Sequence, residues 1–219
     1  MSTTVVAIDG PAGAGKSSVA ALLAKRLGFT HVNTGSLYRA VAFAVRQAGA
    51  AIDPVEQSFL DTLRITFEGN RLLLNGADPG EALRSAACAA DASLVAKQPA
   101  VRAFLLPVQR NIAARQWIVM EGRDIGTVVF PDALVKIFLT ASSLVRAQRR
   151  MKQGEVAPGA TLEDVRREIE QRDLQDSTRA AAPLKPAPDA VTVDDSDLSL
   201  EETVEAIAAI VEAKRSQEG

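Results

Sequence analysis

The chain has 219 residues, of which 47% are hydrophobic and 24% are charged, a composition typical of a folded domain with a sizeable core. Its formal net charge of −2 argues against a general nucleic-acid binder, because such proteins carry an excess of lysine and arginine. The single cysteine, Cys88, excludes a disulfide framework and a thiolate metal site.

The first residues show no targeting pattern. The sequence "MSTTVVAIDG" lacks the basic region and the apolar stretch of a signal peptide. No run in the chain reaches the roughly 18 apolar residues that a membrane span needs. We therefore expect a cytoplasmic protein that has neither a membrane nor a nucleic acid as its partner.

A glycine-rich loop joins the first predicted strand, residues 5–8, to the first predicted helix, Lys16–Leu27. Its pattern Gly-x-x-x-x-Gly-Lys-Ser, residues 10–17, is a P-loop, in which backbone N–H groups curl around phosphate at a helix N-terminus. Lys16 would reach the β- and γ-phosphates, and the Ser17 hydroxyl would ligate Mg²⁺. The predicted ATP-binding residues here are Gly10, Pro11, Ala12, Gly13, Ala14, Gly15, Lys16, Ser17 and Ser18.

The next segment continues the alternation of strands and helices. It predicts a strand at residues 29–32 and a helix from about Ser36 that Gly49 ends. Asp53 stands where an N-cap would, with proline directly after it, and predicts a further helix.

The pattern then changes to two β-rich runs, which predict a small antiparallel insertion at residues 63–91. The dipeptide Gly69-Asn70 is of the kind that joins the strands of a hairpin, and Asn75-Gly76 predicts a second turn.

The following segment returns to helices and buried strands. A long helical stretch is predicted at residues 91–115, broken or bent near Pro99 and Pro107. Residues 117–122 and 135–141 are apolar without alternation, which is typical of strands in a sheet that is covered on both faces.

The C-terminal third predicts an arginine-rich helix at residues 143–153, a helix capped by Thr161, a strand at residues 190–194 and a last helix capped by Ser199. The apolar face of the last helix consists of Leu200, Val204, Ile207, Ala208 and Val211. The whole chain, residues 1–219, is thus expected to form one α/β domain of the P-loop NTPase type, with a five-stranded parallel sheet flanked by helices.

Two predicted strand ends carry candidate ligand-binding side chains. Arg123 and Asp124 follow the strand at residues 117–122, at the edge where open α/β sheets bind ligands. Thr34 and Arg39 lie at a second strand-to-helix transition. A surface ion pair that merely ends a strand is the alternative for Arg123 and Asp124.

A third charged group lies near the C-terminus. Arg172 and Asp176 share a helix face, and Arg179 lies near the end of that helix; a solvated charged face is the alternative interpretation. Residues 146–160 are predicted to form a lid, in which Arg149 and Arg150 could close on phosphates, with a basic helix facing solvent as the alternative.

Taken together, these segments resemble bacterial cytidylate kinases from one end of the chain to the other. The resemblance rests on "IDGPAGAGKSS", "NTGSLYRA", "LNG" with "LRS", "VRAFLLPVQR", "EGRDIGTVVFPDA", "VKIFLTAS", "RAQRRM" and "RDLQDSTRAAAPL". It implies direct, in-line transfer of the ATP γ-phosphate to CMP or dCMP with Mg²⁺, in pyrimidine nucleotide metabolism, by a monomer.

The resemblance also implies a role for each matching position. The cytosine edge would be read by Ser93, Arg102 and Asp124, with Thr34 in the same pocket. The CMP phosphate would be held by Arg39, Arg123 and Arg179, with Arg172 and Asp176 near the ribose and phosphate. The catalytic residues would be Lys16, Arg123, Arg172 and Arg179, and Arg149 would bind ATP. Residues 63–91 would enlarge the monophosphate-binding flap. Asn33 and Thr34 stand where the family often has Asp and Ser.

The residues support phosphoryl transfer independently of the resemblance. A monophosphate acceptor and ATP repel each other, and arginines hold phosphates with a planar fork that matches two oxygens at once. A phosphate oxygen needs no general base, so the single histidine, His31, is expected to be structural. The alternatives are a kinase of another base specificity, such as UMP, and a P-loop ATPase switch without kinase activity.

Overall fold

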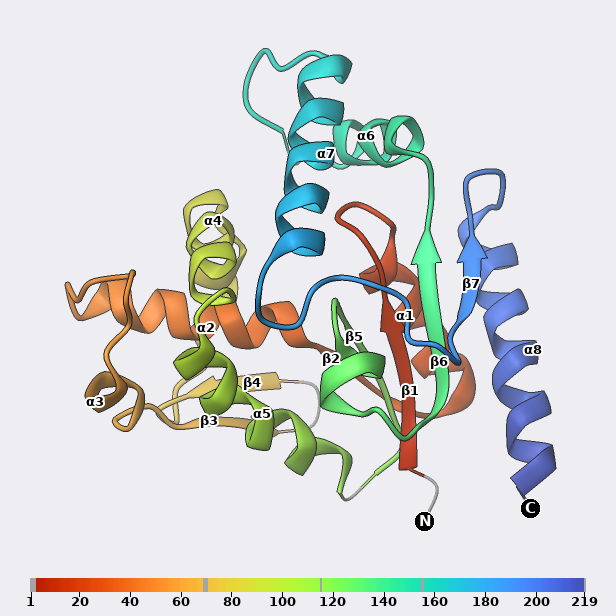
Figure 1. Ribbon diagram of the computed structural model, residues 1–219, viewed down its shortest axis with the longest axis horizontal. Helices are drawn as coiled ribbons and strands as arrows, with labels where there is room; N and C mark the ends of the chain where they lie inside the picture. The colour runs from red at the N-terminus through yellow and green to blue at the C-terminus, as the bar shows by residue number, and fades with distance from the viewer. Residues whose placement is uncertain (1–2, 69–70, 115, 155, 219) are drawn as a thin grey trace. The chain divides into compact units, whose positions relative to one another are not determined.

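The computed structural model describes residues 3–68, 71–114, 116–154 and 156–218. The chain forms two compact units, which are described separately (Figure 1). Unit 1 consists of Met1–His31 and Trp117–Gly219, and unit 2 consists of Val32–Gln116. Within the described ranges, no helix is both long enough and apolar enough to cross a membrane.

A five-stranded sheet organises the fold and confirms the predicted α/β class. Its order is β2 (Thr30–Asn33), β5 (Ile118–Gly122), β1 (Thr3–Asp9), β6 (Ala133–Thr140) and β7 (Val191–Asp194). The pairs β1–β5, β1–β6 and β6–β7 are parallel. Because β1 and β5 are parallel neighbours, the P-loop after β1 and the segment after β5 leave the sheet at the same edge.

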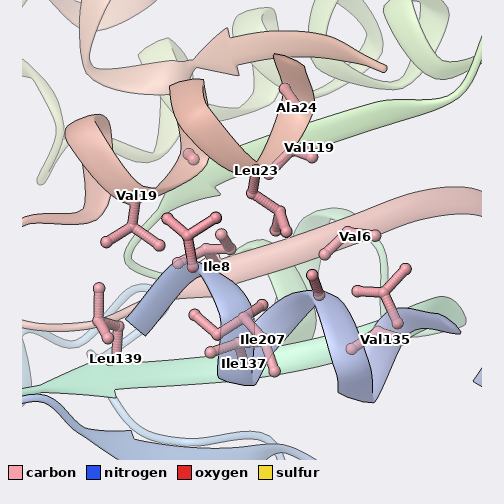
Figure 2. Packing of buried hydrophobic residues seen from close by; sticks show 14 of the residues in the cluster. Val6, Ile8, Val19, Leu23, Ala24, Val119, Val135, Ile137, Leu139 and Ile207 are labelled. Atoms are coloured by element: carbon pink, nitrogen blue, oxygen red, sulfur yellow. The ribbon is translucent and has the colours of Figure 1, made fainter. Parts of the chain in front are cut away.

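Two helices cover one face of this sheet in unit 1 (Figure 2). Ile8 and Ile137 of the sheet pack with Leu23 of α1 (Lys16–Leu27) and Ile207 of α8 (Leu200–Glu218), and all four side chains are fully buried. Replacing Leu23 or another of these side chains with alanine would cost about 2–5 kcal/mol of stability. This packing fixes the helix that begins directly after the P-loop.

The N-terminal end of α8 has the predicted cap. Ser199 and Glu202 bond to each other's backbone N–H groups, at 3.2 and 2.8 Å, which confirms the predicted cap. The prediction that Leu200 belongs to the apolar face is wrong, because Leu200 is 36% exposed. It precedes Thr203 and Val204, the first buried positions of the helix.

An aromatic stack lies beside α1 and α8 in unit 1. The rings of Phe29 and Trp117 stack with their centroids 5.1 Å apart. The guanidinium of Arg215, near the end of α8, lies 5.6 Å from the Phe29 ring centre and 5.1 Å from that of Trp117.

Helices α6 (Ser143–Lys152) and α7 (Leu162–Thr178) pack side by side around a small core of Ala147, Val165 and Ile169 (Figure 1). Thr161 and Asp164 form the predicted capping box at the start of α7. The helix continues to Thr178, which places Arg172 and Asp176 on it as predicted.

Unit 2 has its own apolar core. Its elements are α2 (Thr34–Gln47), α3 (Gln57–Leu60), β3 (Ile65–Glu68), β4 (Arg71–Leu74), the 3-10 helix η1 (Gly80–Arg84), α4 (Ala86–Val95) and α5 (Pro99–Ala113). Strands β3 and β4 are antiparallel as predicted, although the predicted turn at Gly69-Asn70 lies outside the described residues. Asn75 and Gly76 have positive φ angles and form the second predicted turn.

Several predicted boundaries in unit 2 are wrong. No helix begins at Asp53, because the Gln98 side chain takes the local backbone groups: its Oε1 accepts the Val55 N–H, and its Nε2 donates to the Ile52 carbonyl, each at 2.8 Å. The break predicted near Pro99 is confirmed, because α4 ends at Val95 and α5 begins at Pro99. The predicted start near residue 91 is wrong, because α4 already begins after Ser85, whose hydroxyl accepts the Cys88 N–H.

The strand and helix at the start of unit 2 are also shifted from the prediction. Strand β2 ends at Asn33, and α2 begins at Thr34 instead of near Ser36. The Asn33 side chain accepts the Ser36 N–H at 3.3 Å and so caps α2 earlier than the apolar pattern indicated.

Candidate active site

The P-loop glycines are required by close packing and by backbone conformation. At Gly10, which has φ +153°, an added Cβ would lie 2.0 Å from the Leu139 carbonyl oxygen of β6. Gly13 and Gly15 have φ of +73° and +78°, in the left-handed region. The loop is therefore held against the end of β6, with its turns directed by glycine.

Lys16 is buried within the loop that it belongs to. Its side chain lies at the N-terminus of α1, the residue is only 6% exposed, and Nζ donates to the Pro11 carbonyl at 2.7 Å. Burial lowers the pKa of Lys16 well below its ordinary value, and the positive charge of Arg123 lowers it further. A polyanion bound at this loop would relieve both effects, so the site favours phosphate.

Glu121 is a functional candidate that the sequence analysis missed. Its Oε2 accepts the hydrogen bond of Ser17 Oγ at 2.9 Å, and its Oε1 lies 2.9 Å from His31 Nε2. Glu121 is buried near the end of β5, whereas Ser17 is exposed. An acidic residue directly before the segment "GRD" was the available signal. This pair of oxygens fits Mg²⁺, which takes one or two protein oxygens together with water and phosphate oxygens.

Asp9 anchors the segment that carries Arg123 and Asp124. Both of its carboxylate oxygens accept backbone N–H groups, from Ile125 and Gly126, each at 2.8 Å. These bonds hold a π-helical turn, η2 (Ile125–Val129), that the sequence did not predict. Burial raises the pKa of Asp9 to about 6, despite the opposing effect of the two backbone bonds.

The raised pKa of Asp9 predicts a specific pH dependence of stability. Between its ordinary pKa of 3.8 and about 6, the folded state holds the Asp9 proton more strongly than the unfolded state. The Asp9 contribution to the free energy of unfolding therefore falls as the pH rises through this window. Urea denaturation at several pH values gives the free energy of unfolding as a function of pH. Between pH 3.8 and about 6, the slope of this free energy against pH should be more negative for the native protein than for Asp9→Asn. Equal slopes would contradict the raised pKa of Asp9.

Two of the predicted arginines of unit 1, Arg123 and Arg179, each form an ion pair with an aspartate. Arg123 Nε donates to Asp176 Oδ2 at 3.0 Å. Arg179 Nη2 lies 3.5 Å from Asp124 Oδ1, and the side chains of Arg179 and Asp124 are each 7% exposed. The surface-pair alternative for Arg123 and Asp124 does not fit Asp124, which is buried.

Arg172 adds a further positive charge that is partly buried. Its Nε is buried and has no hydrogen-bond partner within the part of the chain that the structure describes. Burial and the charge of Arg123 both lower the pKa of Arg172. Since Arg123 also lowers the pKa of Lys16, the three cations repel one another, and an anion between them would be strongly favoured.

The remaining predicted substrate residues belong to unit 2. Thr34 is buried at the start of α2, which also carries Arg39. Ser93 on α4 donates to the Ala89 carbonyl at 3.3 Å. Arg102 on α5 donates to the Tyr38 hydroxyl at 3.1 Å, with its guanidinium 5.9 Å from the centre of that ring.

The predicted lid arginines are engaged with carboxylates. Arg149 Nη1 donates to both oxygens of Asp195, at 2.9 and 3.0 Å, and Arg150 bonds Glu168 at 3.0 Å. Arg149 still lies beside the P-loop, because a Cβ at Gly15 would be 3.7 Å from its Nη1.

Comparison with known proteins adds a family to this geometry. Residues 6–213 match the family described as cytidylate kinase. The chain is 47% identical over 210 residues to the cytidylate kinase of Thermosipho melanesiensis, covering 95% of this chain and 97% of that one. It is also 47% identical over 224 residues to the cytidylate kinase of Pelotomaculum thermopropionicum, covering 97% of each. A solved structure of an uncharacterized protein from Eubacterium ventriosum has a TM-score of 0.52 at 12% identity, covers 95% of this chain and 98% of that one, and supports the fold alone.

Proposed function

The chain belongs to the cytidylate kinase family, and on that premise we propose that it transfers the γ-phosphate of ATP to CMP or dCMP by direct in-line displacement. The observation that carries the proposal is the group of mutually repelling cations Lys16, Arg123 and Arg172 beside the P-loop, of which Lys16 is buried and the two arginines are partly buried. Such a group is suited to a polyanionic pair of substrates and is costly to maintain for any other purpose.

The chemistry requires that two negatively charged phosphates approach each other. Lys16 and the P-loop N–H groups would hold the triphosphate, and Arg123, Arg172 and Arg179 would hold the acceptor phosphate in line with it. The acceptor oxygen is already deprotonated at neutral pH, so no side chain needs to remove a proton. Asp176 would orient Arg123 through their hydrogen bond of 3.0 Å.

Base recognition would depend on Asp124, which can accept a hydrogen bond from the exocyclic amino group of cytosine. UMP presents a carbonyl oxygen at the same place, and the two oxygens would repel each other. From unit 2, we propose Ser93, Arg102 and Thr34 as further residues that recognise the base, and Arg39 as a further residue that binds the phosphate. A kinase for UMP is the second candidate within the same chemistry.

Mg²⁺ would be held by Ser17, with Glu121 accepting a hydrogen bond from the Ser17 hydroxyl and so orienting its oxygen. When bound, the ion would neutralise charge on the phosphate oxygens. We expect Glu121→Gln to raise the Mg²⁺ concentration at half-maximal rate about 10-fold or more, because residues that orient metal ligands typically control affinity by that amount. Glu212→Gln, an exposed position on α8, should leave this concentration unchanged. An unaltered Mg²⁺ requirement in Glu121→Gln would remove Glu121 from this role.

Two segments would serve substrate binding and closure. Residues 63–91 would extend the flap that holds the monophosphate, and residues 146–160 would act as a lid, with Arg149 moving from Asp195 to ATP. A closed lid would exclude the water that otherwise hydrolyses ATP. We further propose that the protein is a cytoplasmic monomer of pyrimidine nucleotide metabolism.

The decisive experiment measures ADP formation from ATP and Mg²⁺ with CMP, dCMP, UMP, AMP or GMP supplied separately, beside a blank without acceptor. The proposal predicts the fastest formation with CMP and dCMP and almost none in the blank. Equal rates with CMP and UMP would favour the second candidate. Slow hydrolysis at one rate in every sample would indicate an ATPase switch instead.

A further inference from the structure

A partly buried ion pair holds the P-loop through the backbone N–H and the backbone carbonyl of one residue, Ala12. Asp173 Oδ1 on α7 accepts the Ala12 N–H at 3.1 Å, and Arg146 Nη1 on α6 donates to the Ala12 carbonyl at 2.8 Å. The two side chains also bond each other, with Arg146 Nη1 2.5 Å from Asp173 Oδ2. Both backbone hydrogen-bonding groups of Ala12, which belong to two successive peptide units, are therefore used by helices distant in sequence, and the Ala12 N–H points to Asp173.

Both Arg146 and the P-loop make further contacts within unit 1. Arg146 Nε donates to the Ala141 carbonyl, just beyond β6, at 2.9 Å, and the Arg146 side chain is only 8% exposed. At Gly13, an added Cβ would lie 3.3 Å from Arg146 Cβ and 3.7 Å from Ile169 Cδ1. The loop thus rests on α6 and α7 at Gly13, where an added Cβ would make a tighter contact than usual and where the φ of +73° also favours glycine.

The ion pair has a chemical advantage at this place. A lone carboxylate beside the P-loop would repel a triphosphate, but Arg146 neutralises the charge of Asp173. The pair therefore fixes the loop without adding net charge, and the bonds are stronger than those between neutral groups because both side chains are ionised. A purely electrostatic role in phosphate binding would instead require an excess of positive charge.

Asp173 directly follows Arg172 on the same helix. Arg172 carries the buried Nε that lacks a partner among the described residues, and its proposed ligand is the acceptor phosphate. The acceptor's arginine and the anchor of the triphosphate loop are therefore consecutive residues of one helix, α7. An anion that fixes Arg172 would act directly on the helix backbone that carries the anchor.

We propose that Asp173 is a positioning residue that, together with Arg146, couples the two nucleotide sites: occupation of the acceptor site raises the affinity of the P-loop for ATP through the backbone of Ala12. This inference rests on the proposed function for the identity of the two ligands. It adds a contact that touches neither substrate.

The coupling is measured as a ratio of affinities. Calorimetry gives the dissociation constant of a non-hydrolysable ATP analogue with Mg²⁺, in the absence and in the presence of saturating CMP. We expect CMP to lower this constant about 5-fold or more in the native protein, the lower range of typical coupling between sites. Asp173→Ala should bring the ratio close to one, and Asp173→Asn should give an intermediate ratio, because its amide oxygen can still accept the Ala12 N–H.

The ratio of the two dissociation constants, without and with CMP, distinguishes a positioning role of Asp173 from a general effect of its charge and from a loss of folding. Removing the Asp173 charge alters ATP affinity with and without CMP alike, so that effect cancels. Glu170→Gln is the matched control: Glu170 lies on α7, bonds Ser143 of α6 and Arg166, and makes no hydrogen bond to the loop among the residues that the structure describes, so the native ratio should persist. Thermal melts identify a variant that does not fold, and the isosteric Asp173→Asn then carries the test.

Two results would overturn the inference: a native ratio of one, or native coupling retained in the folded Asp173 variants. A native protein that forms ADP with CMP but gives either result would refute the coupling and leave the proposed function intact. A native protein that forms no ADP with any monophosphate would refute the proposed function, and the coupling with it.

Discussion

Lys16→Ala should reduce the rate of phosphoryl transfer to CMP by about 10³-fold or more while leaving the protein folded. The buried ammonium is the one cation that belongs to the P-loop itself, and its Nζ contacts the Pro11 carbonyl across the loop. Its loss would remove a charge-assisted contact to the phosphates that strengthens as charge shifts during transfer. ADP formation with saturating CMP and Mg²⁺ measures the effect.

The variant also removes a buried charge, and this affects stability in a predictable direction. Burial and Arg123 lower the pKa of Lys16, so the charged form is held at a cost in the folded protein without ligand. We therefore expect the melting temperature of Lys16→Ala to be close to the native value or above it. Lys25→Ala, an exposed position on the same helix, should preserve turnover. Turnover retained in Lys16→Ala would refute the proposed role of the P-loop.

Asp124→Asn should reduce the preference for CMP over UMP by about 5- to 100-fold in kcat/KM, the range expected for one buried hydrogen bond whose partner is mismatched. An amide can turn either its oxygen or its nitrogen to the base, so it would tolerate the uracil carbonyl as well as the cytosine amino group. The measurement is kcat/KM for each nucleotide under the same conditions.

The ion pair between Asp124 and Arg179 makes the ratio more informative than either rate. Asp124→Asn removes the charge that faces Arg179 at 3.5 Å, so phosphate binding changes for both nucleotides together. Asp176→Asn offers the comparison, because it alters the partner of Arg123 without touching the base pocket that we propose. Asp176→Asn should lower kcat/KM for CMP and for UMP and leave the ratio of the two values unchanged. An unchanged ratio in Asp124→Asn would place base recognition on other residues.

Features of the fold that depend on local chemistry were predictable from the sequence. The capping boxes at Thr161 and Ser199 and the turn at Asn75-Gly76 each involve side chains within a few residues, and the structure confirms them. The spacing of the P-loop glycines and Lys16 also predicted the strand, loop and helix around them.

Features that depend on distant partners were not predictable in the same way. The turn η2 exists because Asp9, more than a hundred residues earlier, accepts two of its N–H groups. The helix predicted at Asp53 is absent because Gln98 takes the local backbone bonds. The contacts of Glu121 with Ser17 and of Asp173 with Ala12 likewise join separate segments, so no pattern within either segment could reveal them.

Trp117, which stacks on Phe29, gives this protein an intrinsic fluorescence probe. Trp117 is the single tryptophan of the chain and lies in unit 1, whereas the single tyrosine, Tyr38, lies in unit 2. Selective excitation of the indole therefore reports on unit 1, and the near-ultraviolet tyrosine signal reports on unit 2. Coincident loss of the two signals during denaturation would mean that the units melt as one cooperative body, and separate midpoints would mean that each unit melts independently.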